Sequence, residues 1–438
     1  MFNLEANLNV STETQDKITD ILNKHISKVV EYKHISMIEE IFQAEVYDKQ
    51  PLEPKNILLI RLDEIGDMVI TSASIKNIRA KYPDATITFV CSPWVKNMLI
   101  SCPYTDRVIT VNKKIFRKMK NVDIIKNCWA VCRKFLLQYN FDTTIVLRHN
   151  PDTVLENLLC FLSGAVRRWG FNLDSFLWWI ETEPNFVLLG NLMMTRDIIV
   201  PPFITHEADK QLYLMQRLGI PTKYKDLALF FTEKDLNTAK EWLSTLSNTS
   251  IKILIGIAAS IKCKKYPVQR YLQVCQRLLK KYNVSFVVVG SKEEKDDAQF
   301  LEDNLSKERI LNLCCKTTLK ETEAVISLTD CYVGNDTGIM HMASACKIPV
   351  VGLFRESPKQ DIYPFASAVC LFAPYKTKSV ILRPPRPIDD CDDGKYFFGG
   401  CKHLNEPHCI LQITVDDIVN AFKKLYNEII LKRKNNEQ

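Results

Sequence analysis

The sequence carries neither a targeting segment nor a membrane span. The residues after Met1 are polar and lack the charged start and apolar core of a signal peptide. The two most apolar stretches, residues 176–180 and 186–194, are short and are separated by acidic residues and a proline. We therefore expect a cytoplasmic protein. The aromatic and aliphatic residues at 176–179 fit either buried packing or peripheral contact with the inner face of the cytoplasmic membrane.

The sequence also offers no clear metal site. Its fifteen cysteines, without a signal peptide, indicate reduced thiols that mostly pack as small apolar side chains. One close group of potential ligands comprises Cys391, Cys401, His403, His408 and Cys409. This group lacks the Cys-x-x-Cys pair typical of structural zinc sites. We expect no metal, and we favour packing, loop structure or acceptor contacts over zinc for these residues.

Neither sign of charge dominates strongly. Lys and Arg number 58 against 51 Asp and Glu, which gives a net charge of +7, and the clearest basic cluster is residues 432–434. This balance suits a phosphate-bearing substrate or an anionic membrane surface, although a solvated surface explains it more simply. We expect no nucleic-acid partner, and the sequence leaves the oligomeric state open.

The length and the order of predicted elements indicate two α/β domains. A chain of 438 residues is too long for one ordinary core. Apolar runs alternate with helical patterns, which predicts parallel sheets covered on both faces. Strands are predicted at residues 57–60, 86–91, 107–111, 143–147, 251–257, 285–289, 331–333 and 349–354, and helices at 75–81, 130–138, 212–218 and 415–431. We expect a helical extension at 1–50, Rossmann-like domains at 51–205 and 206–412, and at 413–438 a helix and basic tail, with packing back on the first domain as one option.

Two turns, each where an apolar strand gives way to a helix, carry the strongest site signal. The first spans residues 61–67 and ends in Gly66-Asp67, and the second spans residues 331–338 and ends in Asp336-Thr337-Gly338. Each puts a carboxylate at the carboxyl end of a strand, where α/β folds bind their ligands. Two such edges facing one another would form a cleft, so we expect an enzyme acting on a nucleotide-linked substrate.

At these turns the chain resembles the heptosyltransferases of glycosyltransferase family 9, over most of residues 55–425. The matching motifs are Leu-Leu-Ile-Arg-Leu-Asp-Glu-Ile-Gly-Asp at 58–67 and Val-Gly-Asn-Asp-Thr-Gly-Ile-Met-His at 333–341. Weaker agreement lies at 142–148, in a helix ending at 167–171, and at 206–220. The resemblance implies an α/β fold of the GT-B type, with two doubly wound Rossmann-like domains facing a central cleft. It also implies an ADP-sugar donor, inversion at the sugar and no metal requirement.

Two roles fit Asp67. Gly66 permits a tight turn, and Asp67 then lies near the opening of a helix, where acids often serve as caps. The resemblance instead assigns Asp67 as the catalytic base that takes the acceptor proton. A helix N-terminus lowers the pKa of a carboxyl and weakens it as a base unless desolvation or the donor's charge opposes the shift. Asp63 is the neighbouring candidate, and we expect it to shape the loop.

The second turn has the composition of a phosphate site. Small or flexible residues at Gly334, Thr337 and Gly338 let backbone N–H groups approach an anion at the start of a helix. His341 offers a donor to a phosphate oxygen, so the turn would stabilise departing ADP, with a purely structural histidine as the alternative. By resemblance Asp336 holds hydroxyls of the donor sugar, although it also suits a helix cap.

Three further candidates follow strands of the second domain. Lys264 fits the family pattern Lys-x-Trp-Pro with Tyr in place of Trp, and by resemblance it binds the diphosphate; a neighbouring lysine or a solvated basic loop is the alternative. Glu294 by resemblance contacts the nucleoside, unless it only belongs to a solvated helix start. Arg355 stands where the family has small residues, so it adds a cation for a phosphate and leaves the donor's identity open.

The sequence thus predicts transfer of a heptosyl unit from ADP-heptose to a lipopolysaccharide core acceptor. The alternatives are a related transferase with another nucleotide sugar, or with a protein or other surface glycan as acceptor, and a non-catalytic nucleotide-binding module. Both turns are intact, which argues against the module. A nucleotide-sugar epimerase is disfavoured because no Gly-x-Gly-x-x-Gly follows the first strand.

Overall fold

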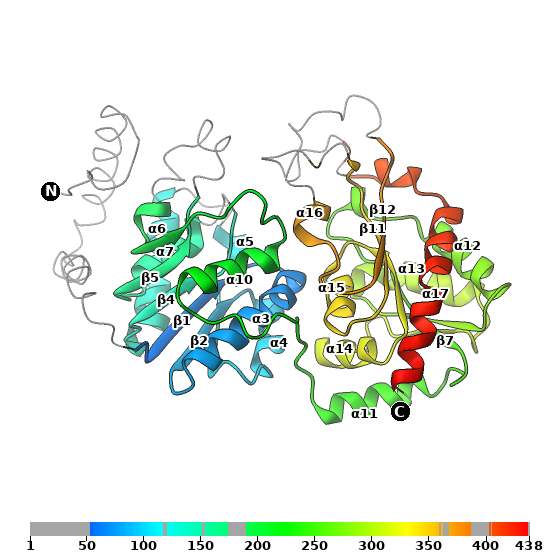
Figure 1. The fold of residues 1–438 in the computed structure, drawn as a ribbon, viewed down its shortest axis with the longest axis horizontal. Coiled ribbons are helices and arrows are strands. Elements are labelled where there is room, and N and C mark those ends of the chain that lie inside the picture. Colours follow the sequence, from blue (N-terminus) through cyan, green and yellow to red (C-terminus); the bar gives the residue numbers. More distant parts are fainter. Residues whose placement is uncertain are drawn as a thin grey trace. The chain divides into compact units, whose positions relative to one another are not determined.

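The structure of the chain is a computed structural model. The structure describes residues 53–116, 121–150, 154–173, 190–358, 361, 368–386, 403 and 405–436 (Figure 1). The expected helical extension at 1–50, the apolar patch at 176–179, and both Cys391 and Cys401 lie outside these residues.

The first sheet has six strands in the order β3-β2-β1-β4-β5-β6. Their bounds are β1 Asn56–Arg61, β2 Thr86–Cys91, β3 Arg107–Thr110, β4 Thr143–Val146, β5 Arg167–Phe171 and β6 Arg196–Ile198. The described pairings within it are parallel, with Ile57 opposite Thr143 in the β1–β4 pair. This order, which starts in the middle and winds outward in both directions, is that of a dinucleotide-binding Rossmann sheet.

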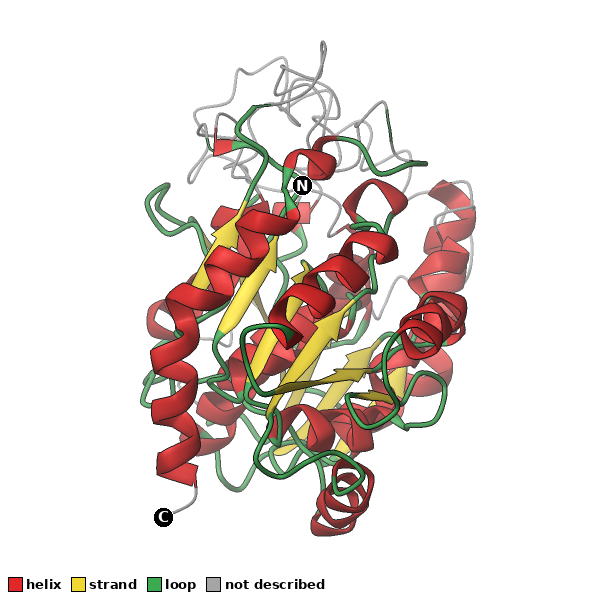
Figure 2. Cartoon of the chain, turned by 90° about the vertical axis from the view of Figure 1, so that its right-hand side faces the viewer, coloured by secondary structure: helices red, strands yellow, loops and turns green. Residues whose placement is uncertain are grey.

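The second sheet repeats the same winding, with the order β12-β11-β10-β7-β8-β9. Its strands are β7 Ile251–Gly256, β8 Val284–Val288, β9 Ile310–Asn312, β10 Cys331–Asn335, β11 Val350–Leu353 and β12 Ser379–Leu382, all paired in parallel. Every residue of β8, β10 and β11 is buried, as expected for strands covered on both faces. Figure 2 shows the strands flanked by helices. The predicted α/β class with two doubly wound sheets is confirmed.

The helices connect these strands and cover the sheets. Their bounds are α3 Ile65–Lys81, α4 Lys96–Ile100, α5 Lys113–Phe116, α6 Asn121–Val131, α7 Val154–Leu162, α10 Glu207–Arg217, α11 Glu233–Leu243, α12 Val268–Leu279, α13 Lys295–Asn304, α14 Leu319–Ser327, α15 Gly338–Ala345, α16 Ala368–Phe372 and α17 Val415–Asn436. The helix predicted at 212–218 begins earlier, because the His206 side chain accepts a hydrogen bond from the Ala208 N–H and caps α10.

Several local predictions need correction. Residues 167–171, expected to end a helix, form strand β5 after α7 has ended at Leu162. The short strands β6, β9 and β12 were not predicted. Packing of the C-terminal helix on the first domain was one option. In the structure, Ile418, Phe422 and Ile429 of α17 belong to the core of the second sheet instead. Its apolar stripe therefore closes that core.

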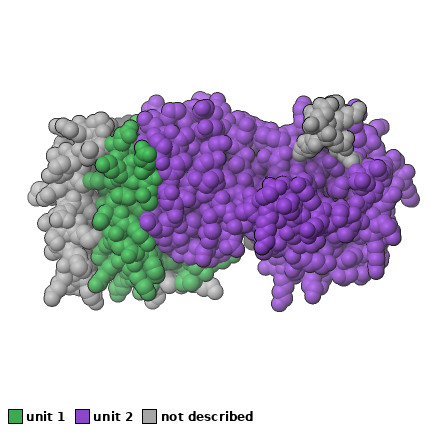
Figure 3. All heavy atoms as spheres, turned by 90° about the horizontal axis from the view of Figure 1, so that it is seen from below, with its two compact units in different colours: residues 1–60, 84–86, 112–199 green, residues 61–83, 87–111, 200–438 purple. Residues whose placement is uncertain are grey.

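The chain divides into two compact units that do not follow the two sheets. One unit contains residues 1–60, 84–86 and 112–199, and the other contains residues 61–83, 87–111 and 200–438 (Figure 3). Helix α3 belongs to the second unit because it packs on α10 and α15. Both predicted turns therefore lie in one compact unit. Among the described residues, no helix combines the length and apolarity needed to cross a bilayer.

Candidate functional site

The first turn joins β1 to α3 and fixes Asp67 in the first helical turn. The Glu64 N–H donates to Asp67 Oδ2 at 3.3 Å, as in a capping box. Arg61 Nη2 donates to Asp67 Oδ1 at 3.1 Å. The Asp67 side chain is 23% exposed. The carboxylate thus meets the structural expectation of a cap, yet it remains accessible to a substrate.

Arg61 organises the carboxylates around this turn. Its side chain is 2% exposed, and its Nε lies 3.1 Å from Asp63 Oδ2. Its Nη2 also lies 3.7 Å from Glu207 Oε2, while Glu207 Oε1 accepts from Lys210 Nζ at 3.0 Å. A buried guanidinium can hold several carboxylates because it presents five donors in a rigid plane. Asp63 therefore orients Arg61, which in turn orients Asp67.

The second turn joins β10 to α15 and leaves the helix start open. Asp336 directly follows the strand and is 8% exposed. Thr337 is the N-cap residue, but its side chain makes no capping hydrogen bond, and its buried Oγ1 has no hydrogen-bond partner among the described residues. Gly334 lies inside β10, where an added Cβ would come within 2.5 Å of Gly256 Cα, so its absent side chain serves strand packing.

Lys264 lies beside this second turn. Its Nζ donates to Asp336 Oδ2 at 2.8 Å. Burial lowers the Lys264 pKa, but the charges of Asp336 and Glu356 and the hydrogen bond to Asp336 together hold that pKa above its ordinary value. The ammonium therefore stays charged throughout the physiological range. Of the neighbouring lysines, Lys262 is exposed and Lys265 pairs with Asp297 at 2.6 Å.

Asn335 connects the end of β10 to the loop that carries Lys264. Its Nδ2 donates to the carbonyls of Ile257 and Ala258 at 3.2 and 3.0 Å. Its Oδ1 accepts from the Tyr266 N–H at 3.3 Å and from the Tyr271 hydroxyl at 2.9 Å. This fully buried amide uses both ends, and it fixes the spacing between the loop and the turn.

The two turns touch one another. A Cβ added to Gly66 would lie 2.7 Å from His341 Cδ2 and 3.2 Å from Gly338 Cα. A Cβ added to Gly338 would lie 3.2 Å from the Gly66 nitrogen and 3.3 Å from Ile65 Cβ. Neither position has room for a side chain without movement of its neighbours. Two glycines far apart in the sequence thus permit the close approach of β1–α3 and β10–α15.

His341 is buried at this contact. Burial lowers its pKa to about 4, with smaller contributions in the same direction from His206 and Lys264 and an opposing one from Asp336. The imidazole is therefore neutral at pH 7. Its Nδ1 is buried and has no hydrogen-bond partner among the described residues. Such a nitrogen is available to a ligand that reaches the turn.

The remaining predicted residues lie at two further strand ends. Glu294, after β8, is 6% exposed, and its Oε2 accepts from both the N–H and the hydroxyl of Ser291 at 2.8 Å. It is thus a buried cap rather than a solvated helix start. Arg355, after β11, lies with its Nε 3.1 Å from Glu356 Oε1. Because the charges of Arg355 and Glu356 both act on Lys264, these residues adjoin the second turn.

Metal ligands do not gather at this site. Within the described part of the chain, no group of three or more His, Cys, Asp or Glu residues is arranged to hold a metal ion. His403 and His408 stack on each other with their ring centroids 3.7 Å apart, which is a packing arrangement.

Arg61, Glu207 and Asn335 have structural roles at the site that were not predicted from the sequence. Arg61 could have been noticed from the sequence, because a basic residue directly after a buried apolar run is unusual. Glu207 and Asn335 gave no comparable signal, because their partners are remote in the sequence.

The folded chain is similar to solved glycosyltransferases. It superposes on the glycosyl transferase family 9 protein from Veillonella parvula with a TM-score of 0.64 and 21% identity, covering 86% of this chain and 99% of that one. It superposes on ADP-heptose lps heptosyltransferase II of Escherichia coli with a TM-score of 0.60 and 18% identity, with the same coverage. With its two doubly wound sheets, the chain therefore has the GT-B fold of these enzymes.

Sequence comparison finds similarity to the same kind of enzyme. Residues 188–382 match Glycosyltransferase family 9 (heptosyltransferase). Lipooligosaccharide heptosyltransferase 2 of Haemophilus ducreyi is 23% identical over 310 residues, which cover 67% of this chain and 80% of that protein. Residues 188–382 carry the similarity to glycosyltransferase family 9, the heptosyltransferase family, and the chain is a glycosyltransferase.

Proposed function

We propose that this glycosyltransferase moves a heptosyl unit from ADP-heptose to a lipopolysaccharide core acceptor, with inversion at the anomeric carbon. The observation that carries the proposal is the contact between the two turns, which brings the carboxylate-bearing start of α3 beside the open start of α15. The names of the Haemophilus ducreyi relative and of the Escherichia coli structure support this donor and this class of acceptor.

In the proposed reaction Asp67 is the base. Its Oδ atoms accept from the Glu64 N–H and from Arg61, and the side chain is 23% exposed, so an acceptor hydroxyl can approach it. The hydroxyl proton passes to Asp67 as the acceptor oxygen attacks the anomeric carbon. The bond from that carbon to the phosphate oxygen breaks, and its electron pair leaves with ADP.

The second turn would bind the donor and take up the charge that develops on ADP. The open helix start at Thr337 and Gly338 favours an anion, and the Lys264 ammonium adds a full charge beside it. The neutral His341 has a buried nitrogen free for a phosphate oxygen. Asp336 would accept donor-sugar hydroxyls, Glu294 would contact the ribose, and Arg355 would add a cation for a phosphate.

The proposal divides the substrates between the domains expected from the sequence. Residues 51–205 would hold a glycolipid or other glycan acceptor, and residues 206–412 would hold the nucleotide sugar. The donor is a substrate, and no metal is assigned a step. The reaction would run in the cytoplasm, with peripheral contact at the inner face of the membrane, where such an acceptor is found.

The experiment is a donor panel. The protein is incubated with ADP-heptose and with other nucleotide sugars, each with and without lipopolysaccharide core acceptor, and released nucleotide and acceptor mass are measured. We expect ADP release and a gain of one heptose only when ADP-heptose and acceptor are both present. Turnover of another nucleotide sugar would identify a related transferase. Binding of a nucleotide sugar without nucleotide release would indicate a non-catalytic module, and isomerisation of the sugar without acceptor would indicate an epimerase.

A further inference from the structure

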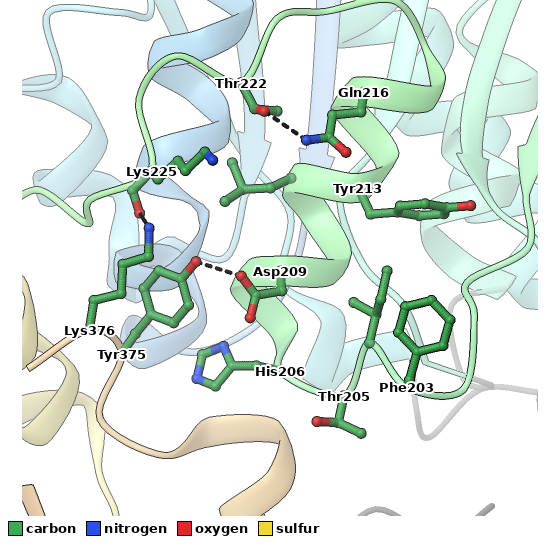
Figure 4. Close-up of a pocket in the computed structure, with 12 residues that line it drawn as sticks. Phe203, Thr205, His206, Asp209, Tyr213, Gln216, Thr222, Lys225, Tyr375 and Lys376 are labelled. Carbon is green, nitrogen blue, oxygen red and sulfur yellow. Dashed lines mark hydrogen bonds between the residues drawn. The ribbon is translucent and has the colours of Figure 1, made fainter.

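A cavity with no assigned role lies next to the candidate site, on the far side of the α10 start. Its volume is about 430 Å³, within the range of small-molecule pockets. Helix α10 supplies one wall, the segment before it and residues 222–225 supply others, and Tyr375 and Lys376 complete it (Figure 4). We call it the α10 pocket. All its lining residues belong to the same compact unit.

Hydrogen bonds tie the α10 pocket together at its base. The Tyr375 hydroxyl donates to Asp209 Oδ1 at 2.6 Å, and the His206 and Tyr375 rings lie 4.8 Å apart. His206 Nδ1 accepts from the Ala208 N–H, so the proton of the neutral ring is on Nε2, which donates to the Ala373 carbonyl at 2.9 Å. These hydrogen bonds hold the side chains of His206, Asp209 and Tyr375 in place around the pocket.

Two lysines give one side of the α10 pocket a positive charge. Lys225 and Lys376 are exposed; Lys376 Nζ donates to the Lys225 carbonyl at 3.5 Å and lies 5.2 Å from the centroid of the Tyr375 ring. Among the described residues no carboxylate forms an ion pair with either lysine, whereas the nearby Asp226 pairs with Lys347 at 2.7 Å. Asp209 carries the one negative charge of the lining, so the cavity has a net positive charge of one.

Aromatic rings line the opposite side. Figure 4 shows Phe203 and Tyr213 there, across the cavity from Lys225 and Tyr375. Phe203 is 83% exposed, the largest value among the large hydrophobic side chains that are described as exposed. An exposed ring on the rim of a cavity costs solvation free energy that a ligand can recover.

Lys376 also adopts an unusual backbone conformation. Its φ is +50°, in the left-handed region that is uncommon for a lysine. Lys347 Nζ donates to the Lys376 carbonyl at 3.3 Å and helps to hold this conformation. Strained residues persist where the surroundings fix them, and they concentrate at functional sites. The conformation places a cation at the cavity wall.

We infer that the α10 pocket binds a sugar unit that carries a phosphate or carboxylate group. The lysines match the anion, the aromatic rings match the C–H face of a sugar, and Asp209, Gln216 and Thr222 offer partners for its hydroxyls. The unit is either part of the acceptor glycan or a free sugar phosphate. Only the first of these two sources rests on the proposed function.

The binding test uses D-mannose 6-phosphate as the probe, with D-mannose and inorganic phosphate as partial probes, in isothermal titration of the full chain. We expect saturable binding of the sugar phosphate at least tenfold tighter than of either partial probe. Lys225→Gln/Lys376→Gln should weaken binding at least tenfold, and Phe203→Ala should weaken binding of the sugar phosphate but not of phosphate. Lys280→Gln, an exposed lysine at the end of α12, is the matched control.

A double variant that binds the sugar phosphate as well as Lys280→Gln does would overturn the assignment, as would no saturable binding by the unaltered chain. If the double variant does not fold, the single variants answer the same question. A transfer assay then separates the sources. An acceptor unit predicts that mannose 6-phosphate raises the acceptor KM, and a free effector predicts a change in kcat at constant acceptor KM. Absence of transfer would count against the proposed function while the binding result stands.

Discussion

The two strand-to-helix turns have the same topology and opposite helix starts. After β1, the carboxylate of Asp67 lies inside the helix and accepts from the Glu64 N–H, so α3 begins with its own anion in place. After β10, Asp336 precedes the helix and is turned to Lys264, while Thr337 leaves α15 uncapped. The first turn therefore supplies its own negative charge at the helix start, whereas the second leaves the helix start open to an anionic ligand.

This difference explains how one pair of similar motifs can serve two substrates. A capped helix start has little attraction for a further anion, but it holds a carboxylate in a fixed orientation, as proton transfer requires. An uncapped start beside a lysine attracts the diphosphate of a nucleotide sugar. The contact of Gly66 with His341 and Gly338 then brings the two functions together.

Removing the charge beside the open turn should have the largest effect on stability and on ADP binding. Lys264→Gln leaves Asp336 largely buried without its cation, so we expect a loss of about 3 kcal/mol in the free energy of unfolding. ADP affinity should fall about 100-fold, since a charged contact to the diphosphate is lost. Titration calorimetry and urea unfolding measure the two effects. The exposed neighbour Lys262→Gln is the control, and equal effects of both variants would contradict the assignment of Lys264.

The neutral His341 should make stability depend on pH. Its pKa is about 4 in the folded protein and about 6.5 when unfolded, so the unfolded chain binds more protons between these values. Stability should therefore fall as the pH drops from 6.5 to 4, by roughly 3 kcal/mol in total. His341→Gln should remove that part of the pH dependence in urea unfolding. Saturating ADP should reduce the pH dependence of stability in the unaltered protein. If neither His341→Gln nor ADP changed this pH dependence, the result would argue against an anion site at His341.

Separating the two turns should impair both functions. Gly66→Ala adds a Cβ 2.7 Å from His341 Cδ2, so we expect a loss of about 1–3 kcal/mol in stability together with weaker ADP binding. Gly170→Ala in β5 is the control, because its added Cβ meets Met194 Sδ at an ordinary 3.4 Å. If Gly66→Ala were as stable and as active as Gly170→Ala, the contact would not matter.

The smallest change tests the open cap alone. Thr337→Val removes a hydroxyl for which the described part of the chain shows no hydrogen-bond partner within normal geometry, so stability should change little while ADP binds about fivefold more weakly. Thr71→Val on α3 is the mirror control. The Thr71 hydroxyl donates to the Asp67 carbonyl at 2.7 Å, so its loss should cost about 1 kcal/mol of stability with no effect on ADP. Identical behaviour of the two variants would remove the distinction between the turns.

The sequence predicted most interior strands and the edge strand β3, but it missed the other edge strands and β5. Largely apolar runs identified β1, β2, β7 and β8, because strands buried on both faces are rich in apolar residues. The edge strands β6, β9 and β12 are short and carry polar residues, so they lack that signal. Strand β5 contains the fully buried Arg168, whose guanidinium donates to the carbonyls of Met193 and Ala165, and a sequence pattern treats arginine as a surface residue.

In the candidate site, too, local sequence pattern shows some residues and misses others. Gly66, Asp67 and residues 336–338 lie next to one another in the sequence, so local pattern suffices to find them. The Arg61–Glu207 pair and the Asn335 bridge join segments that are adjacent only after folding. Gly334 was read as part of the turn, although its close partner Gly256 lies on a neighbouring strand.

The most direct test of the division between the turns is to measure ADP affinity and heptosyl transfer together in Asp67→Asn, with Asp63→Asn alongside. The account predicts that Asp67→Asn binds ADP within about twofold of the unaltered protein while its turnover falls about a thousandfold, the range expected for a lost general base. Asp63→Asn acts on Asp67 only through Arg61, so it should lower turnover far less than Asp67→Asn does. Preserved turnover in Asp67→Asn, or a parallel loss of ADP binding, would contradict the assignment of chemistry to the first turn and donor binding to the second.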